Sequence, residues 1–273
     1  MSPVADAKVI KQDKIAPGHF RLYLFAPEIA EAAKPGQFVH VRCGHTSDPL
    51  LRRPVSIHAV DREKGKVILF YRVAGKGTSL LSKNNRGDTI SLLGPLGHGF
   101  SIPSRHARIF VVAGGIGIAP LYFFLQEIAD SGTSADVFLG AATEKQLFFM
   151  NEIKESGHRV FPSTDDGSTG YHGTVTGLFE EYLRKSDNQS GPIRRGDDAK
   201  VYGCGPYGML KRLTDIITTA GITGEVSLEE RMGCGVGACL SCACKTRSGE
   251  NGVQYRRACV EGPVFPAKEV VWE

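Results

Sequence analysis

The stretch that decides the architecture runs from Arg231 to Cys259 and reads RMGCGVGACLSCACKTRSGENGVQYRRAC. Four of its cysteines are separated by four, two and sixteen residues: Cys234, Cys239, Cys242 and Cys259. Thiolate sulfur is the soft ligand that iron-sulfur chemistry requires. Glycines at positions 233, 235 and 237 let the backbone take left-handed turns and point amide N–H groups at a bound group. The pattern therefore predicts a metal-binding module.

The spacing favours a 2Fe-2S cluster over a structural zinc ion. It equals the plant-type pattern, in which one loop carries three cysteines and a distant fourth closes the site. Structural zinc sites more often use close cysteine pairs separated by a spacer. We therefore predict a 2Fe-2S cluster in an electron-carrying module, with four ligands: Cys234, Cys239, Cys242 and Cys259.

The other cysteines are expected to be packing residues. Cys244 lies two residues beyond Cys242, so in an extended segment it shares a face with that ligand and is at most its neighbour. Cys43 ends the strand-like segment QFVHVRC and is expected in a core. Seven cysteines with four engaged by iron argue against a disulfide framework and for a reducing compartment.

Length and composition indicate two ordinary domains plus a small module. The chain has 273 residues, of which 41% are hydrophobic. The N-terminal segment MSPVADAKVIKQDK lacks the apolar stretch of a signal peptide, and no run approaches a membrane span. We expect a cytoplasmic protein without a membrane partner. The net charge of +4 with scattered basic residues gives little support to nucleic-acid binding.

Residues 1–102 predict a small antiparallel β-barrel, and residues 103–225 a doubly wound α/β domain. The first region has short strands with turn punctuation at 8–15, 19–26, 37–43, 54–61, 66–73 and 88–94. In the second region strands at 108–114, 135–141, 158–164 and 199–205 alternate with helices at 121–132, 145–155, 176–184 and 207–219. A polar surface loop is predicted at 186–198. The cluster module takes residues 226–273.

Two motifs of the barrel suit a flavin. Arg53 and Ser56, in the segment RRPVSI, supply a cation for a pyrophosphate and a hydroxyl for the reactive ring edge. The strand that contains Phe70–Arg72 runs into AGKGT, a glycine-rich turn at the expected start of a helix, where backbone N–H groups bind phosphate. Each motif alone also fits an exposed strand arginine or a capped helix. Their order ahead of a nucleotide-type sheet favours the flavin.

The motifs RPVSI, FYRVAGKGTSL, LLGPLGHGF and VVAGGIGIAPL resemble the ferredoxin-NADP reductase superfamily, and the resemblance spans the chain. It implies a flavin barrel ahead of a nicotinamide-binding domain. Arg53 and Gly77–Thr78 would contact the FAD pyrophosphate, with Arg53 also able to contact the ribityl chain; Ser56 would contact the isoalloxazine edge, and Phe70–Arg72 the flavin and adenosine side. The implied FAD-binding positions are Arg53, Pro54, Val55, Ser56, Phe70, Tyr71, Arg72, Gly77 and Thr78.

Two turns of the second domain predict the nicotinamide site. The first contains Gly114, Gly115 and Gly117, and it departs from the G-x-G-x-x-G pattern because Pro120 takes the place of the third glycine. Proline is tolerated in the first turn of a helix, so N–H groups remain free for a pyrophosphate. The second turn contains Cys204, Gly205 and Pro206. In the superfamily this cysteine lies by the nicotinamide ring, so Cys204 and Ser56 are the predicted catalytic residues.

The expected nucleotide is NAD. No arginine follows the strand ADVFLGAAT closely, whereas Glu144 does, and a carboxylate suits ribose hydroxyls and repels a 2′-phosphate. Asp165 and Asp166, in the loop after HRVFPST, are predicted nucleotide contacts. The competing possibility is an arginine that reaches the site from elsewhere: Arg159, Arg194 or Arg195.

The tail EERMGCGVGACLSCACKT with YRRACVEGPVF resembles the electron transfer subunits of class B dihydroorotate dehydrogenases. This resemblance implies a heterotetramer with an FMN-containing catalytic subunit, and electrons that pass through the cluster and FAD to NAD+ in pyrimidine biosynthesis. Nothing in the chain resembles a dihydroorotate site. His58 and His98 could be proposed as proton donors, but histidines in such places are more often structural.

Other functions remain open at this point. One is a flavin and iron-sulfur subunit of an NADH-dependent ferredoxin-NADP oxidoreductase, a sulfide dehydrogenase or a hydrogenase. In the first of these an aspartate can bind the cluster, and the four well-spaced cysteines count against it. Another is a non-enzymatic iron-sulfur redox sensor with a vestigial barrel, against which the intact nucleotide motifs count.

Overall fold

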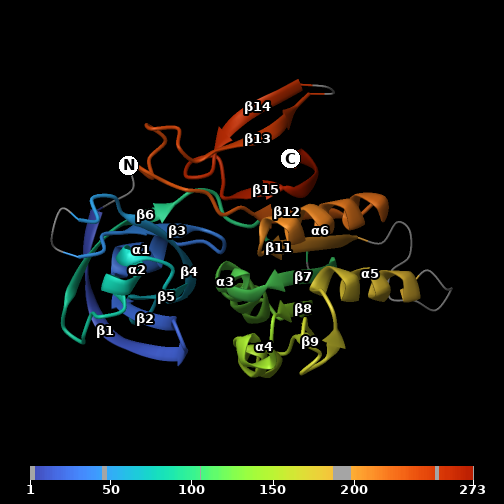
Figure 1. Cartoon of the computed structure of the whole chain (residues 1–273), viewed down its shortest axis with the longest axis horizontal. Helices are drawn as coiled ribbons and strands as arrows, with labels where there is room; N and C mark the ends of the chain where they lie inside the picture. The colour runs from blue at the N-terminus through green and yellow to red at the C-terminus, as the bar shows by residue number, and fades with distance from the viewer. Residues whose placement is uncertain (1–3, 45–47, 105, 187–197, 250–251, 273) are drawn as a thin grey trace.

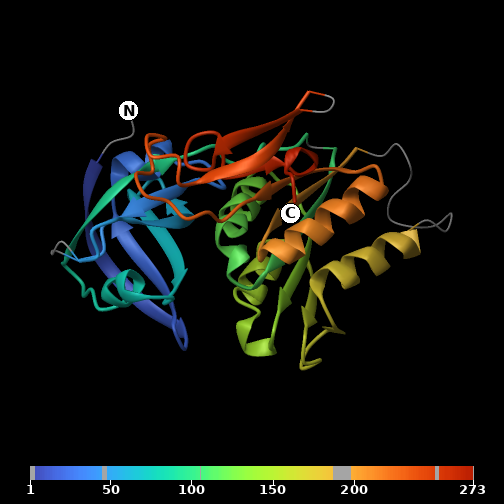
Figure 2. The same ribbon diagram turned by 45° about the horizontal axis from the view of Figure 1, so that its top comes forward.

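The computed structural model describes residues 4–44, 48–104, 106–186, 198–249 and 252–272. A barrel and an α/β lobe lie side by side, and the C-terminal segment, red in Figure 1 and Figure 2, crosses over both. This arrangement brings three parts of the sequence to one place.

The N-terminal part is a closed six-stranded antiparallel barrel, as predicted. Its strands follow the order β1-β2-β5-β4-β3-β6. Alternating residues of β6 are buried, which is the period expected of a barrel wall with one face inside. The bounds are β1 Val4–Ala16, β2 His19–Phe25, β3 Phe38–Val41, β4 Arg53–Asp61, β5 Lys66–Arg72 and β6 Thr89–Leu96, with two short helices, α1 Pro27–Ala32 and α2 Lys76–Leu81.

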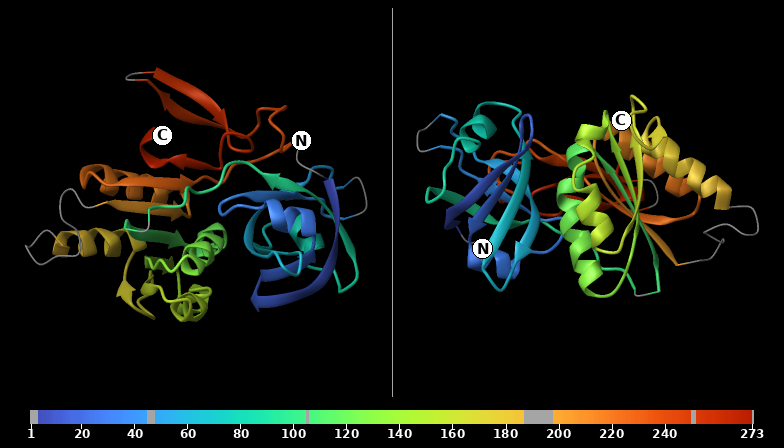
Figure 3. Two further views of the ribbon diagram at one scale, coloured as in Figure 1. Left: turned by 180° about the vertical axis from the view of Figure 1, so that it is seen from behind. Right: turned by 90° about the horizontal axis from the view of Figure 1, so that it is seen from below.

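The second part contains a seven-stranded sheet of order β10-β9-β8-β7-β11-β12-β15. Six strands run parallel and the central ones are apolar throughout, because helices cover both faces. Helix α3 lies between the sheet and the barrel, and α5 and α6 cover the opposite face (Figure 3). The strands are β7 Arg108–Gly114, β8 Asp136–Ala141, β9 Arg159–Thr164, β10 Tyr171–His172, β11 Ala199–Cys204 and β12 Thr223–Ser227. The helices are α3 Ile118–Asp130, α4 Met150–Glu155, α5 Val175–Ser186 and α6 Tyr207–Thr219.

The structure corrects the helix expected at 145–155. A short 3₁₀ turn spans Glu144–Gln146, and α4 begins only at Met150. Phe149 has a left-handed backbone with φ of 62°, which no α-helix tolerates in its interior. The apolar run from Leu147 to Phe149 turns into the core instead of continuing a helix. Helix α1 and strands β10 and β12 to β15 were not expected from the sequence.

The C-terminal part is joined to the sheet by hydrogen bonds. It contains a hairpin, β13 Ala243–Ser248 and β14 Gly252–Arg257, followed by β15 Val264–Pro266. Strand β15 pairs antiparallel with β12, so the predicted cluster module completes the sheet of its neighbour. The limits 1–102, 103–225 and 226–273 stay a proposal. The segment predicted as a loop at 186–198 lies almost entirely outside the described residues. Among the helices described, none is both long and apolar enough to cross a bilayer.

Candidate functional site

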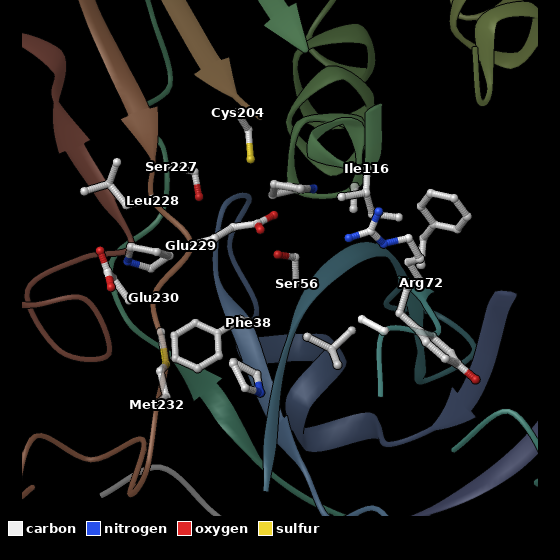
Figure 4. A pocket seen from close by; sticks show the side chains of 18 of the residues that line it. Phe38, Ser56, Arg72, Ile116, Cys204, Ser227, Leu228, Glu229, Glu230 and Met232 are labelled. Atoms are coloured by element: carbon white, nitrogen blue, oxygen red, sulfur yellow. The ribbon is translucent and has the colours of Figure 1, made fainter. Parts of the chain in front are cut away.

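A cavity of about 410 Å³ lies where all three parts of the chain meet (Figure 4). Its walls come from β4 and β5 of the barrel, the start of α3, and the segment Ser227–Met232 that leaves β12. That segment ends two residues before Cys234, the first cysteine of the cluster loop. Nine predicted positions line this central cavity: Pro54, Val55, Ser56, Phe70, Tyr71, Arg72, Thr78, Pro120 and Cys204.

Arg53 and Gly77 lie side by side at the edge of the central cavity. A Cβ atom on Gly77 would be 3.1 Å from Nε of Arg53, so glycine lets the guanidinium approach the start of α2. The hydroxyl oxygen of Thr78 accepts N–H bonds from Ala74 at 2.9 Å and Gly75 at 3.2 Å. It is therefore engaged in shaping the turn, and the cation beside that turn suits a pyrophosphate.

Glu229 is a residue of the central cavity that the sequence did not single out. Figure 4 shows its side chain extending towards Cys204 and Ser56. Burial raises the pKa of Glu229, and the charge of Arg72 opposes the shift. Burial, with a further contribution from Glu229, raises the pKa of Cys204, which keeps its thiol protonated at neutral pH. Glu229 follows the carboxyl end of β12 closely. Because this strand was not expected from the sequence, the position of Glu229 at a strand end was not recognised.

A second cavity, of about 700 Å³, lies along the carboxyl ends of β7, β8 and β11. This is the edge at which open α/β sheets bind nucleotides. Gly114, Gly115, Asp165 and Pro206 line it. The remaining predicted positions shape the turns around it: a Cβ on Gly117 would collide with the carbonyl oxygen of Cys204, and one on Gly205 would be 2.8 Å from the sulfur of Met209.

Asp166 shapes the loop beside the nucleotide cavity. Its carboxylate accepts bonds from the hydroxyl of Ser168 at 2.6 Å and the N–H of the same residue at 3.0 Å. Ser168 also accepts the backbone N–H of Glu144 at 2.9 Å. The acidic side chains in the described lining of the cavity are Asp165 and Glu180, and Glu144 is not among them.

Among the described residues, one cation lines the nucleotide cavity, and it was not predicted from the sequence. Arg212 of α6 donates to Glu180 of α5 at 2.8 Å, and Arg184 donates to the same carboxylate. Arg159 lies instead at the amino end of β9, where its guanidinium bonds Asp136 at 2.6 Å. Arg159 therefore does not reach the nucleotide cavity, which lies at the carboxyl ends of the strands. Arg194 and Arg195 lie outside the described residues.

The cluster loop has the backbone shape that a thiolate-bound cluster needs. The N–H groups of Val236, Ala238 and Cys239 point at the sulfur of Cys234, at 3.4, 3.2 and 3.4 Å. Gly235 and Gly237 have φ values of 73° and 80°, which favour glycine. A hydrogen bond from Ser241 lowers the pKa of Cys239 to about 6. The loop thus surrounds the sulfur of Cys234 with N–H donors.

The four predicted ligands form two neighbouring pairs. Cys239 accepts the N–H of Cys234 at 3.4 Å, and Cys242 lies against Cys259, with both of the latter buried. Within the part of the chain that the structure describes, no three His, Cys, Asp or Glu side chains converge on one metal ion. Two pairs suit a cluster of two irons held by four thiolates. The residues therefore fit an iron-sulfur cluster.

Cys43, Cys244 and His98 have packing roles. Cys244 is buried and its thiol donates to the carbonyl of Arg256 at 3.3 Å, while burial raises the pKa of the Cys43 thiol to about 11. Nδ1 of His98 lies 2.7 Å from the carbonyl oxygen of Val260. These contacts stabilise loops and strands. They indicate a structural role for Cys43, Cys244 and His98 rather than a catalytic one.

Two of the contacts between the barrel and the rest of the chain bury a histidine of the barrel. At the sheet junction, formed by His58, Phe70, Tyr122 and Phe149, Nδ1 of His58 lies 3.1 Å from the carbonyl oxygen of Ala119 and its ring stacks on Tyr122 at 4.3 Å. At the loop junction, formed by His40 and Gly235, a buried imidazole meets the cluster loop. Burial and the charge of Arg52 lower the pKa of His40 to about 4.

Two protein families match parts of this chain. Residues 229–271 match the iron-sulfur cluster binding domain of dihydroorotate dehydrogenase B, and residues 111–215 match the oxidoreductase NAD-binding domain. Two relatives are electron transfer subunits of dihydroorotate dehydrogenase B (NAD(+)). The protein from Desulforamulus reducens is 47% identical over the full length of both chains, and that from Geobacillus thermodenitrificans is 40% identical over 96% of each.

Solved structures share the fold. The chain aligns with a structure of an NADH-dependent reduced ferredoxin-NADP oxidoreductase with a TM-score of 0.83 and 32% identity, over 100% of this chain and 92% of that one. The cytochrome b5 reductase domain of Ulva prolifera nitrate reductase aligns with a TM-score of 0.65 over 81% of this chain and 94% of that one. At 17% identity the second match concerns the fold alone.

Proposed function

The chain belongs to the family of electron transfer subunits of NAD-dependent dihydroorotate dehydrogenase B, and we propose that it transfers electrons from an FMN-containing catalytic subunit to NAD+ by means of a 2Fe-2S cluster and FAD. This makes it an oxidoreductase subunit of pyrimidine biosynthesis. The catalytic subunit would supply the dihydroorotate site.

One observation carries the proposal. The central cavity is walled by the barrel, by the nicotinamide turn at Pro120 and Cys204, and by the segment that continues into the cluster loop. A flavin exchanges single electrons or a hydride, whereas clusters take single electrons and NAD+ takes a hydride. A group in this cavity would stand between the two other carriers.

The residues around the central cavity divide the work of holding FAD. Arg53, beside the start of α2, would bind the pyrophosphate, and Ser56 would hydrogen-bond the ring edge. Cys204 and Glu229 close the side towards the nucleotide cavity, where the turns at Gly114 and Pro206 would hold NAD. Cys234, Cys239, Cys242 and Cys259 would hold the cluster.

The test is reconstitution with and without the partner. The isolated chain should oxidise NADH with an artificial acceptor but not oxidise dihydroorotate, because it offers the nicotinamide and flavin sites alone. Addition of the FMN-containing subunit should couple dihydroorotate oxidation to NAD+ reduction. Turnover of dihydroorotate by the partner-free chain, or a complex that oxidises it without reducing NAD+, would refute the proposal.

A second candidate deserves the same experiment because of the structural match to an NADH-dependent reduced ferredoxin-NADP oxidoreductase. Isolation of the native complex separates the two. A dihydroorotate-oxidising flavoprotein in it supports the first function, and a second NADP-dependent flavoprotein supports the other. We further propose a heterotetramer, as the family resemblance implies. We also propose a reducing cytoplasm, because none of the seven cysteines forms a disulfide.

A further inference from the structure

His40 connects the flavin wall of the barrel to the cluster loop. It lies on β3, which pairs with the predicted flavin strand β4: Phe38 is opposite Ser56 and His40 is opposite Pro54. Residues two apart on a strand share a face, so Phe38 and His40 point the same way. Phe38 lines the central cavity, and His40 is the next side chain along that face. The two cofactor regions are thus one strand step apart.

The His40 ring touches the backbone between Cys234 and Val236. A Cβ atom on Gly235 would be 2.6 Å from Nδ1 of His40, closer than any real Cβ contact, so glycine is required for this approach. Arg52 fixes the strand behind the ring, because its guanidinium donates to the carbonyls of His40 at 3.3 Å and Ser91 at 2.8 Å. The imidazole is therefore held against the loop.

Neither ring nitrogen of His40 makes a well-formed hydrogen bond among the residues that the structure describes, the backbone of Cys234 is the nearest polar group, and the residue is 0% exposed. Leaving a buried polar group unpaired is unfavourable, because the group has lost its hydrogen bonds to water. The other buried histidines are better satisfied: both nitrogens of His158 are bonded, and His58 has one bond. The His40 ring therefore lies beside the backbone of Cys234 without a well-formed hydrogen bond, and this position suits a further acceptor at the cluster site.

We propose that His40 is a positioning residue for the iron-sulfur cluster: it clamps the loop at Gly235 and donates its ring N–H to sulfur of the cluster site beside Cys234. This inference rests on the proposed function, since it requires a cluster. Hydrogen bonds to cluster sulfur stabilise the reduced state, which carries more negative charge, and so they raise the reduction potential. The barrel would thereby adjust the potential of a cluster bound by a distant part of the sequence.

The test uses the full chain loaded with FAD and cluster, and a redox titration followed by electron paramagnetic resonance. His40→Phe keeps a flat ring and removes the donor. It should lower the cluster potential by a tenfold change in the one-electron equilibrium, about 59 mV. His40→Asn retains an N–H donor and should recover part of the shift. His58→Phe, the matched control at the sheet junction, should leave the potential unchanged.

An unchanged potential in His40→Phe with full iron content overturns the inference, as does an equal shift in His58→Phe. If the wild-type chain binds no cluster, the proposed function itself fails, which distinguishes the two. If His40→Phe binds no cluster, a double-mutant cycle between positions 40 and 235 tests whether His40 clamps the loop. Gly235→Ala should lose iron, and adding His40→Ala should recover part of it because the colliding atom is gone. Absence of recovery would show that the clamp is not His40.

Discussion

The sheet junction and the loop junction bury histidines of the same barrel, and they are completed in different ways. At the sheet junction His58 bonds the carbonyl of Ala119 and lies among three aromatic rings. At the loop junction the His40 ring lies against the backbone of Cys234 and Gly235, and neither ring nitrogen makes a well-formed hydrogen bond to a described residue. Protein atoms supply the hydrogen bond of His58 at the sheet junction. At the loop junction the ring nitrogens of His40 could bond a bound group.

The two junctions should therefore affect different properties: the sheet junction the stability of the fold, and the loop junction the binding of the cluster. Changes at the sheet junction should appear in the free energy of unfolding, because large buried rings are involved. Changes at the loop junction should appear in the cluster, since the His40 ring lies against the loop that carries Cys234. Four predictions, from the largest expected effect to the smallest, sharpen or break this contrast.

The largest effect is expected on the cluster side. Cys239→Ser should abolish the intact cluster, because a hydroxyl is a poor substitute for a thiolate ligand to iron. Cys244→Ser is the matched control, only two residues from the ligand Cys242, and should leave the iron content unchanged. Iron and sulfide analysis of the purified proteins measures both. Loss of iron in the Cys244 variant with retention in the Cys239 variant would exclude the assignment.

On the sheet side, Tyr122→Ala should lower the free energy of unfolding by about 3 kcal/mol or more. Its ring packs on His58 and Phe149, and its hydroxyl donates to Glu152 at 2.8 Å. Tyr122→Phe keeps the ring and should cost only about 1 kcal/mol. Urea denaturation gives both values. Iron per folded chain should not change, and a selective loss of iron would contradict the contrast between the junctions.

The preference of the nucleotide cavity for NADH over NADPH should depend on the charged side chains in its lining. We predict at least tenfold higher kcat/KM for NADH than for NADPH, about 1.4 kcal/mol or more. Asp165 lines the cavity, and Arg212 is already engaged by Glu180. Steady-state diaphorase kinetics at matched ionic strength measure the ratio. Comparable values for the two nucleotides would show that a cation, Arg212 being the nearest candidate, grips the 2′-phosphate.

The smallest effect concerns Glu229 in the central cavity. Its folded-state pKa is raised by burial, so the stability contributed by the protonated form is full below the ordinary glutamate range and is lost as pH rises through the raised value. In the FAD-free chain Glu229→Gln should therefore be more stable than wild type at pH 8. Melting curves should converge near pH 4. A variant less stable at pH 8 would mean that the carboxylate is stabilised there, by Arg72.

The barrel, the parallel sheet and the iron-sulfur module could be predicted because each carries a local pattern. Alternating strands, glycine turns and thiol spacing are visible in consecutive residues. Glu229 and Arg212 could not, because their importance depends on contacts between elements. Glu229 follows TGEVS, a segment too weak in strand signal to recognise, and Arg212 is one of several polar residues on a helix. Phe149 escaped prediction since only tertiary packing explains its left-handed backbone.

The pairing of β15 with β12 has a consequence for the synthesis of the chain. On the ribosome the barrel emerges first and can close, but the sheet stays open along β12 until Val264–Pro266 has been translated. An exposed strand edge is a template for pairing with other chains. A nascent or prematurely terminated chain would thus carry an unprotected edge beside its most apolar strands, and chaperones would have to cover it until the last described strand arrives.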